Sequence, residues 1–163
     1  MIELKKINGD NIDEVIALEV GEEQKELIET NNLRSFADAH MFNTDGIPAT
    51  PLAIYADEVI VGFLMYIFDT LDYESFEHEV FYGAKSYFIW HIMIDQSFQG
   101  KGYGKLSFEQ LLRNIESMPD GKAEYVSLFY HTSNIKAKTL YASLGFKDTG
   151  IIQDNSMLAI KRL

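Results

Sequence analysis

The chain has 163 residues, no cysteine and a net charge of −11 at pH 7, from 25 acidic and 14 basic residues. This length fits one domain with a substantial buried core, and the absence of cysteine excludes disulfides, thiolate metal sites and a cysteine nucleophile. The negative charge argues against nucleic acid as a partner, because nucleic-acid binding depends on neutralising phosphates with lysine and arginine.

The N-terminal segment is predicted to begin as a strand and continue as a helix. It lacks the apolar core of a signal peptide, and no apolar run approaches the about 18 residues of a membrane span, so we expect a cytoplasmic protein without a membrane partner. Residues 2–7 alternate like a strand, and Asp10 or Asn11 is placed to cap a following helix. Apolar residues then recur at helical spacing over residues 12–30, where Gly21 is a candidate break.

A second short helix is predicted in ETNNLRSFADAHMF, residues 29–42. Its N-cap is expected at Thr30, Asn31 or Asn32. Four residues at helical spacing form its predicted apolar stripe, namely Leu33, Phe36, Ala37 and His40. We expect this stripe to pack against a sheet.

Three strands and a long loop follow. DGIPATP, residues 45–51, indicates a loop, and residues 52–56 and 59–68 form strands with the two-residue spacing of a hairpin. Residues 69–86 are acidic and aromatic, which favours a loop that is helical in part. YFIWHIMI, residues 87–94, is apolar except for one histidine, which is typical of a central strand.

The remaining segments alternate helices and strands. They are a helix from about Gly104 to Met118, a turn at 119–121, a strand at 124–131, a helix at 134–144 that Gly145 terminates, and strands at 146–152 and 157–160. The complete order, β-αα-ββ-β-α-β-α-ββ, predicts a mixed α/β sheet with helices on both faces.

The stretch FQGKGYGKLSF, residues 98–108, places three glycines between an aliphatic strand and a helix. Such an arrangement aims backbone N–H groups at an anion, and the helix dipole favours negative charge there. The glycines have no Cβ, so a diphosphate could lie against the backbone. The stretch fits neither a Walker A loop nor the GxGxxG pattern, because leucine follows the GK pair and the third glycine comes one residue early. An ordinary flexible turn is the alternative.

A second motif, HTSNIKAKTLYASLGFKDTG, begins about 30 residues after the glycine stretch. With the aliphatic strand and the Gln-x-x-Gly-x-Gly loop, it makes the chain resemble the GNAT N-acetyltransferases, whose fold has the element order predicted above. The matching residues are Gln99, Gly102, Gly104, Asn134, Tyr141, Gly145 and Phe146. Within that family, the first half resembles bacterial polyamine acetyltransferases of the spermine/spermidine type.

The resemblance implies a single N-acetyltransferase domain over residues 1–163, with a splayed central sheet that leaves room for acetyl-CoA. Residues 1–86 would form mainly the amine side and residues 87–163 mainly the acetyl-CoA side, and no metal is expected. The residues implied in acetyl-CoA binding are Ile92, Met93, Ile94, Gln99, Gly100, Lys101, Gly102, Tyr103, Gly104, Lys105 and Asn134. The backbone N–H near Ile94 would polarise the thioester carbonyl.

Tyr141 is implied as the general acid that protonates the departing CoA thiolate. Its spacing also suits a packed core aromatic. Asn134 likewise has two interpretations, a ligand of the cofactor arm or a simple N-cap. Lys101 and Lys105 are either phosphate ligands or solvated lysines.

The candidate base is His91, because an amine with a pKa near ~10.4 must lose a proton before it attacks. A satisfied core histidine is the alternative. Strand alternation predicts that Trp90 faces away from His91, unless a bulge resets the parity. Residues 77–79, Glu-His-Glu, could also act through water.

Acidic residues are concentrated in the first half. Residues 1–79 contain 18 of the 25 acids and 4 of the 14 bases, whereas residues 80–163 contain 7 acids and 10 bases. This distribution suits a cationic ligand on the first half, although a solvated acidic surface is the alternative. The candidate amine-binding residues are Glu22, Glu26, Tyr73, Glu74, Glu77 and Glu79.

The sequence therefore favours an enzyme that transfers acetyl from acetyl-CoA to a primary amine of a small cationic substrate, a polyamine or diamine, by direct attack in a ternary complex. Acetylation of a protein N-terminus or lysine is one alternative, and a non-catalytic acyl-CoA-binding regulatory protein is another. The resemblance also implies a homodimer that pairs through edge strands.

Overall fold

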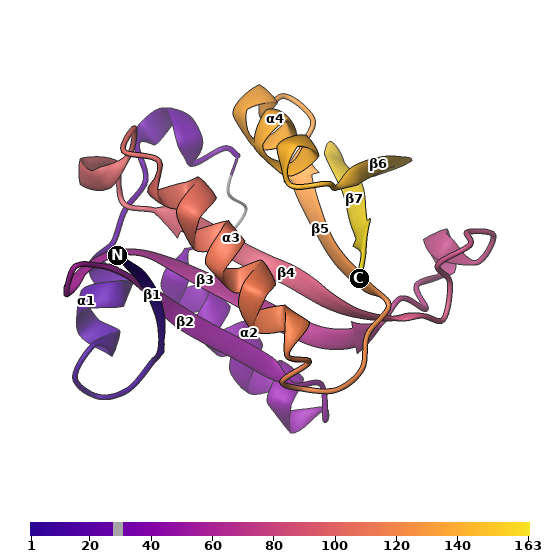
Figure 1. Cartoon of the computed structure of the whole chain (residues 1–163), viewed down its shortest axis with the longest axis horizontal. Coiled ribbons are helices and arrows are strands. Elements are labelled where there is room, and N and C mark those ends of the chain that lie inside the picture. Colours follow the sequence, from indigo (N-terminus) through magenta and orange to yellow (C-terminus); the bar gives the residue numbers. More distant parts are fainter. Residues whose placement is uncertain (28–30) are drawn as a thin grey trace.

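The computed structural model describes residues 1–27 and 31–163, which form one mixed seven-stranded sheet with helices on both faces (Figure 1). The strands are β1 (Ile2–Lys6), β2 (Ala49–Ala56), β3 (Val59–Thr70), β4 (Lys85–Ile94), β5 (Tyr125–His131), β6 (Lys147–Gln153) and β7 (Ser156–Arg162). Their order is β1-β2-β3-β4-β5-β7-β6. The β4–β5 pair is parallel and its neighbours pair antiparallel, which confirms the predicted mixed α/β fold.

Two apolar cores lie on opposite faces of this sheet. The helices are α1 (Ile12–Ala17), α2 (Asn32–Thr44), α3 (Tyr103–Glu116) and α4 (Ile135–Ser143), with short 3-10 turns at Glu22–Gln24, Glu74–Phe76 and Gln96–Phe98. Helices α1 and α2 pack on the face that carries Phe63 and Met65, whereas α3 and α4 pack on the face that carries Leu64 and Tyr87. No helix among the described residues is both long and apolar enough to cross a bilayer.

Helix α1 is much shorter than the sequence predicts. It ends at Ala17, and the backbone of Leu18 is already extended, with ψ 137°. The next residue, Glu19, is hydrogen-bonded to the two residues that follow β4. Its N–H donates to the Asp95 carboxylate at 2.9 Å, and its carbonyl accepts the Gln96 N–H at 2.8 Å. Over the described residues 18–27, the prediction of one helix is therefore wrong except for the 3-10 turn at Glu22–Gln24, because these tertiary hydrogen bonds override local helical spacing. Glu29 and Thr30 lie outside the described residues.

Helix α2 buries a different face from the one predicted. Its N-cap is Asn31, whose side chain accepts the Arg34 N–H at 2.8 Å, as one of the three predictions had it. Leu33, however, is 59% exposed, and Ala37 and His40 are also exposed, so the predicted apolar stripe is wrong at these three positions. Phe36, its fourth member, does pack on the sheet, edge-on against Phe63. The buried positions are Asn32, Ser35, Asp38 and Ala39. The helix consequently turns polar side chains toward the sheet.

A β-bulge interrupts β4 at Trp90. Met65 of β3 pairs with His91, but the next residue, Tyr66, pairs with Ile89, so that Trp90 is an extra residue on β4. The bulge resets the strand parity, and both Trp90 and His91 hydrogen-bond to side chains of α2. The exception that the sequence analysis allowed therefore holds, and Trp90 and His91 both reach α2.

Strands β4 and β5 diverge after a short paired stretch. Their pairing covers Ser86–Ile89 and Tyr125–Leu128, and beyond it β4 continues to Ile94 and β5 to His131. The ribbons of the two strands separate visibly in Figure 1. This divergence is the splay that the resemblance implies, and it opens the sheet where the candidate site lies.

Candidate active site

The space between β4 and β5 is a cavity of about 610 Å³. One wall comes from β4, including Trp90, His91 and Ile92, and the other from β5 and α4, including Asn134 and Tyr141. A volume of this size is typical of a small-molecule site. The cavity therefore gathers predicted residues that are far apart in the sequence.

The end of β4 has main-chain groups that face away from β3. The Asp95 N–H donates to the Val61 carbonyl of β3 at 2.9 Å, so by strand alternation the Ile94 N–H points to the opposite edge. Among the described residues, β4 has no strand partner on that edge beyond Ile89. The Ile94 carbonyl accepts the Gln99 side-chain amide at 2.9 Å. Gln99 thus ties the glycine turn to the strand end. The Ile94 N–H faces the β5 side of β4, and neither Ile94 nor the glycine turn is among the residues that line the cavity.

The two residues before Ile94 on β4, Ile92 and Met93, point to opposite faces of the sheet. Ile92 lines the cavity. The Met93 side chain is buried in the opposite core, where its sulfur lies 3.8 Å from the Asn32 amide nitrogen. Any contact of Met93 with a ligand in the cleft would therefore be through its main chain.

The glycine turn has the backbone that glycine alone adopts easily. Gly100 and Gly102 have φ of +77° and +80°, in the left-handed region. Gly102 is the N-cap of α3, and the first helical bond runs from the Leu106 N–H to its carbonyl at 3.2 Å. The N–H groups of residues 103–105 precede that bond and have no acceptor within the helix. This turn fits an anion such as a pyrophosphate.

Residues around the turn add positive charge at its surface. The Lys101 ammonium lies 5.3 Å from the centre of the Phe98 ring, and the Lys105 ammonium lies 3.9 Å from the Glu109 carboxylate. Tyr103 is half-buried against the core beneath α3. A Cβ on Gly104 would lie 3.8 Å from Ile94, an ordinary contact, so the fold itself requires no glycine there.

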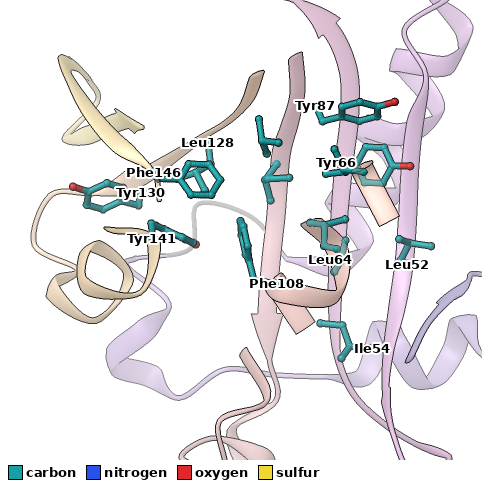
Figure 2. Packing of buried hydrophobic residues seen from close by; sticks show 14 of the residues in the cluster. Leu52, Ile54, Leu64, Tyr66, Tyr87, Phe108, Leu128, Tyr130, Tyr141 and Phe146 are labelled. Carbon is teal, nitrogen blue, oxygen red and sulfur yellow. The ribbon is translucent and has the colours of Figure 1, made fainter. Parts of the chain in front are cut away.

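Asn134 and Tyr141 both have the structural role that the sequence allowed, and both also line the cavity. The Asn134 side chain accepts the Ala137 N–H at 3.1 Å and caps α4, and it also lines the cavity. Tyr141 is 8% exposed and packs against Phe108 with ring centroids 5.3 Å apart. Figure 2 shows Phe108 between the Tyr141 ring and the side chains of β3. Burial raises the pKa of Tyr141 to about 12, so the phenol keeps its proton at neutral pH.

His91 is a buried neutral imidazole. It is 6% exposed, its Nδ1 lies 2.6 Å from the Ser35 hydroxyl, and Phe63 packs edge-on against its ring. Its Nε2 is buried without a hydrogen-bond partner among the described residues. Burial lowers the pKa of His91 to about 4, so the ring is uncharged at neutral pH.

A carboxylate on α2 escaped the sequence analysis. Asp38 lines the cavity and accepts two hydrogen bonds, from Arg34 Nε at 2.7 Å and from Trp90 Nε1 at 3.2 Å. A signal was present in the sequence, because polar residues recur every three positions at Asn32, Ser35 and Asp38. The predicted apolar stripe placed these residues on the solvent side.

The predicted amine-binding residues are dispersed. Tyr73 lines the cavity. Glu79 lies instead in a second pocket, beside Lys147 and Arg162. The glutamates that are exposed and absent from the described cavity wall are Glu22, Glu26, Glu74 and Glu77. Their part in amine binding stays a prediction.

The fold and site can be compared with known proteins. The acetyltransferase (GNAT) family model matches residues 14–146. The chain is 28% identical over 159 residues to the spermine/spermidine N(1)-acetyltransferase of Bacillus subtilis (strain 168), a match that covers 94% of this chain and 93% of the relative.

Two solved structures share the fold. The Vibrio cholerae spermidine N-acetyltransferase, in complex with CoA and spermine, has a TM-score of 0.68 at 14% identity and covers 99% of this chain and 95% of its own. The Thermoplasma acidophilum PaiA N-acetyltransferase, in complex with coenzyme A, has a TM-score of 0.66 at 13% identity. The match covers 100% of this chain and 99% of the PaiA chain. At these identities the comparison concerns the fold alone.

Proposed function

Because the chain belongs to the acetyltransferase (GNAT) family, we propose that it transfers an acetyl group from acetyl-CoA to a primary amine of a small cationic substrate, in a ternary complex. A polyamine or diamine is the first choice, supported by the name of the Bacillus subtilis relative and by the spermine in the Vibrio cholerae complex. The observation that carries the proposal is the cavity between the diverging strands, which brings Ile92 of β4 together with Asn134 and Tyr141.

Acetyl-CoA, when bound, would supply the acetyl thioester. We assign its pyrophosphate to the glycine turn, Gln99 to Lys105, and its arm to the main chain of Ile92–Ile94 and to Asn134. The N–H groups of residues 103–105 and the two nearby lysines suit a diphosphate. The Ile94 N–H, which faces the β5 side of β4, is the donor that would stabilise negative charge on the carbonyl oxygen.

Tyr141 has the proton needed at the departing sulfur. A thiol has a pKa of about 8.5, well below the pKa of about 12 that burial gives Tyr141. Complete proton transfer from the phenol to a thiolate is therefore uphill. We propose that Tyr141 acts chiefly as a hydrogen-bond donor that stabilises the thiolate as it forms.

The acceptor must reach the site as a free amine. At pH 7 that deprotonation costs about 4–5 kcal/mol for an ordinary primary amine. His91 has a pKa of about 4, so it cannot retain the proton at neutral pH. In the tautomer whose Nδ1–H donates to Ser35, its Nε2 can accept a hydrogen bond from the amine. Proton transfer to solvent, with Glu77 or Glu79 acting through water, stays a prediction.

The division of labour between the two halves follows the same proposal. The glycine turn, Asn134 and Tyr141 belong to residues 87–163, and α2 belongs to residues 1–86. We extend the proposal to the cytoplasmic location and the homodimer that the sequence suggests, and both stay predictions.

The test is release of CoA thiol from acetyl-CoA in the presence of spermidine, a basic peptide or an aminoglycoside, with the acetylated atom located by mass spectrometry. We expect turnover with spermidine. Activity on peptides alone would reassign the protein to protein acetylation. Thermal stabilisation by acetyl-CoA without thiol release for any amine would instead favour a regulatory binding protein.

A further inference from the structure

The buried face of α2 is unusually polar. Asn32, Ser35 and Asp38 follow one another at three-residue spacing, and each is at most 5% exposed. A helix that packs on a sheet normally buries apolar residues, and buried polar groups are costly unless they find partners. Asn32 has a structural partner in the Val15 carbonyl at 2.8 Å. The other two residues face the bulge of β4 and the cavity.

Asp38 is held unequally by its two donors. Its side chain is 7% exposed, whereas the side chain of Arg34, its ion-pair partner, is 66% exposed. The second donor, the Trp90 indole, belongs to the bulge and fixes the carboxylate from the sheet side. Arg34 can therefore leave Asp38 by rotating into solvent, while Asp38 and Trp90 stay in place.

The cavity contains few other groups that could bind a cation. Among the described residues that line it, the carboxylates are Asp38 and Asp154, and Asp154 is exposed. Tyr73, Phe76 and Phe129 add aromatic walls. An ammonium is attracted strongly to a carboxylate in such a poorly solvated place, and aromatic faces assist it. Surface glutamates, by contrast, are screened by water.

A polar atom without a described partner belongs to another residue of the cavity wall, His91. Ser35, one turn before Asp38, bonds His91, and Trp90 and His91 are consecutive residues of the bulge. The His91 Nε2 is buried and has no partner in the described part of the chain. The cavity wall therefore carries both the Asp38 carboxylate, which has about four acceptor sites and two described donors, and a residue with a buried nitrogen that can accept a hydrogen bond.

We infer that Asp38 binds an ammonium group of the acceptor other than the amine that reacts, and that this ammonium takes the place of Arg34 on the carboxylate. Trp90 orients the carboxylate, and the carbon chain of the acceptor lies along the aromatic wall. This inference rests on the proposed acetyl transfer and adds the residue that recognises the acceptor. It also gives Arg34 a role, as the cation that occupies Asp38 in the absence of substrate.

The kinetic test compares Asp38→Asn with Arg34→Ala. Asparagine keeps the shape of the side chain and an oxygen for the Trp90 indole but loses the charge. We expect Asp38→Asn to raise the KM for spermidine at least tenfold and to leave the KM for acetyl-CoA within twofold. Arg34→Ala should leave the spermidine KM unchanged or lower it, because it frees the carboxylate. Asp45→Asn, at the exposed C-terminal end of α2, is the matched control and should behave as wild type.

The result that overturns the inference is an unchanged spermidine KM in Asp38→Asn. An equal rise in both variants also overturns it, because a purely structural ion pair loses the same contact from either side. Thermal melts of the variants identify a loss that is due to unfolding.

A binding measurement separates this inference from the proposed function. Trp90 is the single tryptophan of the chain and donates to Asp38, so its fluorescence reports on that carboxylate. We expect 1,4-diaminobutane, but not uncharged 1,4-butanediol, to change the emission of the wild-type protein saturably, whether or not thiol is released. Absence of a change would overturn the inference, and it would do so even if Asp38→Asn fails to fold. Absence of thiol release with an intact emission change would reject only the proposed function.

Discussion

Ser35 Oγ lies 2.6 Å from His91 Nδ1 and joins α2 to the bulge of β4. The contact satisfies one ring nitrogen, while the other is buried without a partner among the described residues. Because water cannot solvate a charge there, the pKa of His91 falls to about 4. The folded protein therefore keeps the His91 ring neutral, and protonation of the ring lowers the free energy of unfolding.

The free energy of unfolding should consequently decrease as the pH is lowered, because His91 resists protonation in the folded protein. The unfolded chain binds a proton on this histidine near pH 6.5, whereas the folded protein resists it until about pH 4. The stabilisation is present above pH 6.5 and is lost as the pH falls toward 4. We expect urea unfolding to show that the wild type loses about 2–3 kcal/mol more than His91→Gln between pH 7 and pH 4.5. Parallel losses in both proteins would show that His91 is not the cause.

Tyr141→Phe should separate chemistry from packing. The ring and its contact with Phe108 are kept, so the melting temperature should change little. Loss of a hydrogen bond to a developing charge should lower kcat by roughly 10- to 100-fold, with the KM for acetyl-CoA within twofold. Steady-state kinetics at saturating acetyl-CoA measure both constants. An unchanged kcat would leave Tyr141 as a core aromatic only.

Gly102→Ala should weaken acetyl-CoA binding beyond its effect on stability. Its φ of +80° is unfavourable for alanine, which costs about 1–2 kcal/mol. Gly150, on β6, has a φ of +88° and, like Gly102, open space around its missing Cβ, so Gly150→Ala is a matched control for the strain. Both variants should lose similar stability, and only Gly102→Ala should raise the KM for acetyl-CoA. Equal kinetics would refute a role of the turn in binding.

Gly62→Ala tests the close approach of β3 to β4. A Cβ at Gly62 would lie 2.4 Å from the Met93 carbonyl oxygen, which is backbone and cannot move aside cheaply. We expect a loss of about 1–3 kcal/mol or more in chemical unfolding, together with weaker acetyl-CoA binding as the end of β4 shifts. Gly9→Ala has nothing within 4 Å and should be nearly neutral. A stable Gly62→Ala protein with normal kinetics would contradict this geometry.

The parts of the fold that follow from local chemistry could be predicted from the sequence. The hairpin between β2 and β3 turns at Asp57 and Glu58, which have φ of +48° and +73°, and Gly145 ends α4 with a φ of +88°. Turn residues and apolar runs mark such places directly. The glycine turn and Asn134 could likewise be recognised as motifs. Gly100 and Gly102 adopt positive φ and Asn134 caps α4, and both features depend only on the neighbouring backbone.

The parts that were missed depend on contacts between distant segments. Helix α1 ends at Ala17, two residues before Glu19, whose N–H donates to the Asp95 carboxylate. The buried polar face of α2 exists because Ser35 and Asp38 meet the bulge of β4. A one-residue bulge leaves no mark on composition or spacing, yet it decides which side chains enter the cavity.

The divergence of β4 and β5 also affects how the whole molecule holds together. Among the described residues, four residue pairs join the sheet of β1–β4 to that of β5–β7. Amide hydrogens of β4 that face the gap have no strand acceptor and should exchange with deuterium faster than those along Ser86–Ile89. A ligand that spans the gap would bind the folded protein alone and make the two halves open as one unit. The supply of acetyl-CoA would then set the resistance of this chain to proteolysis, as well as its rate of turnover.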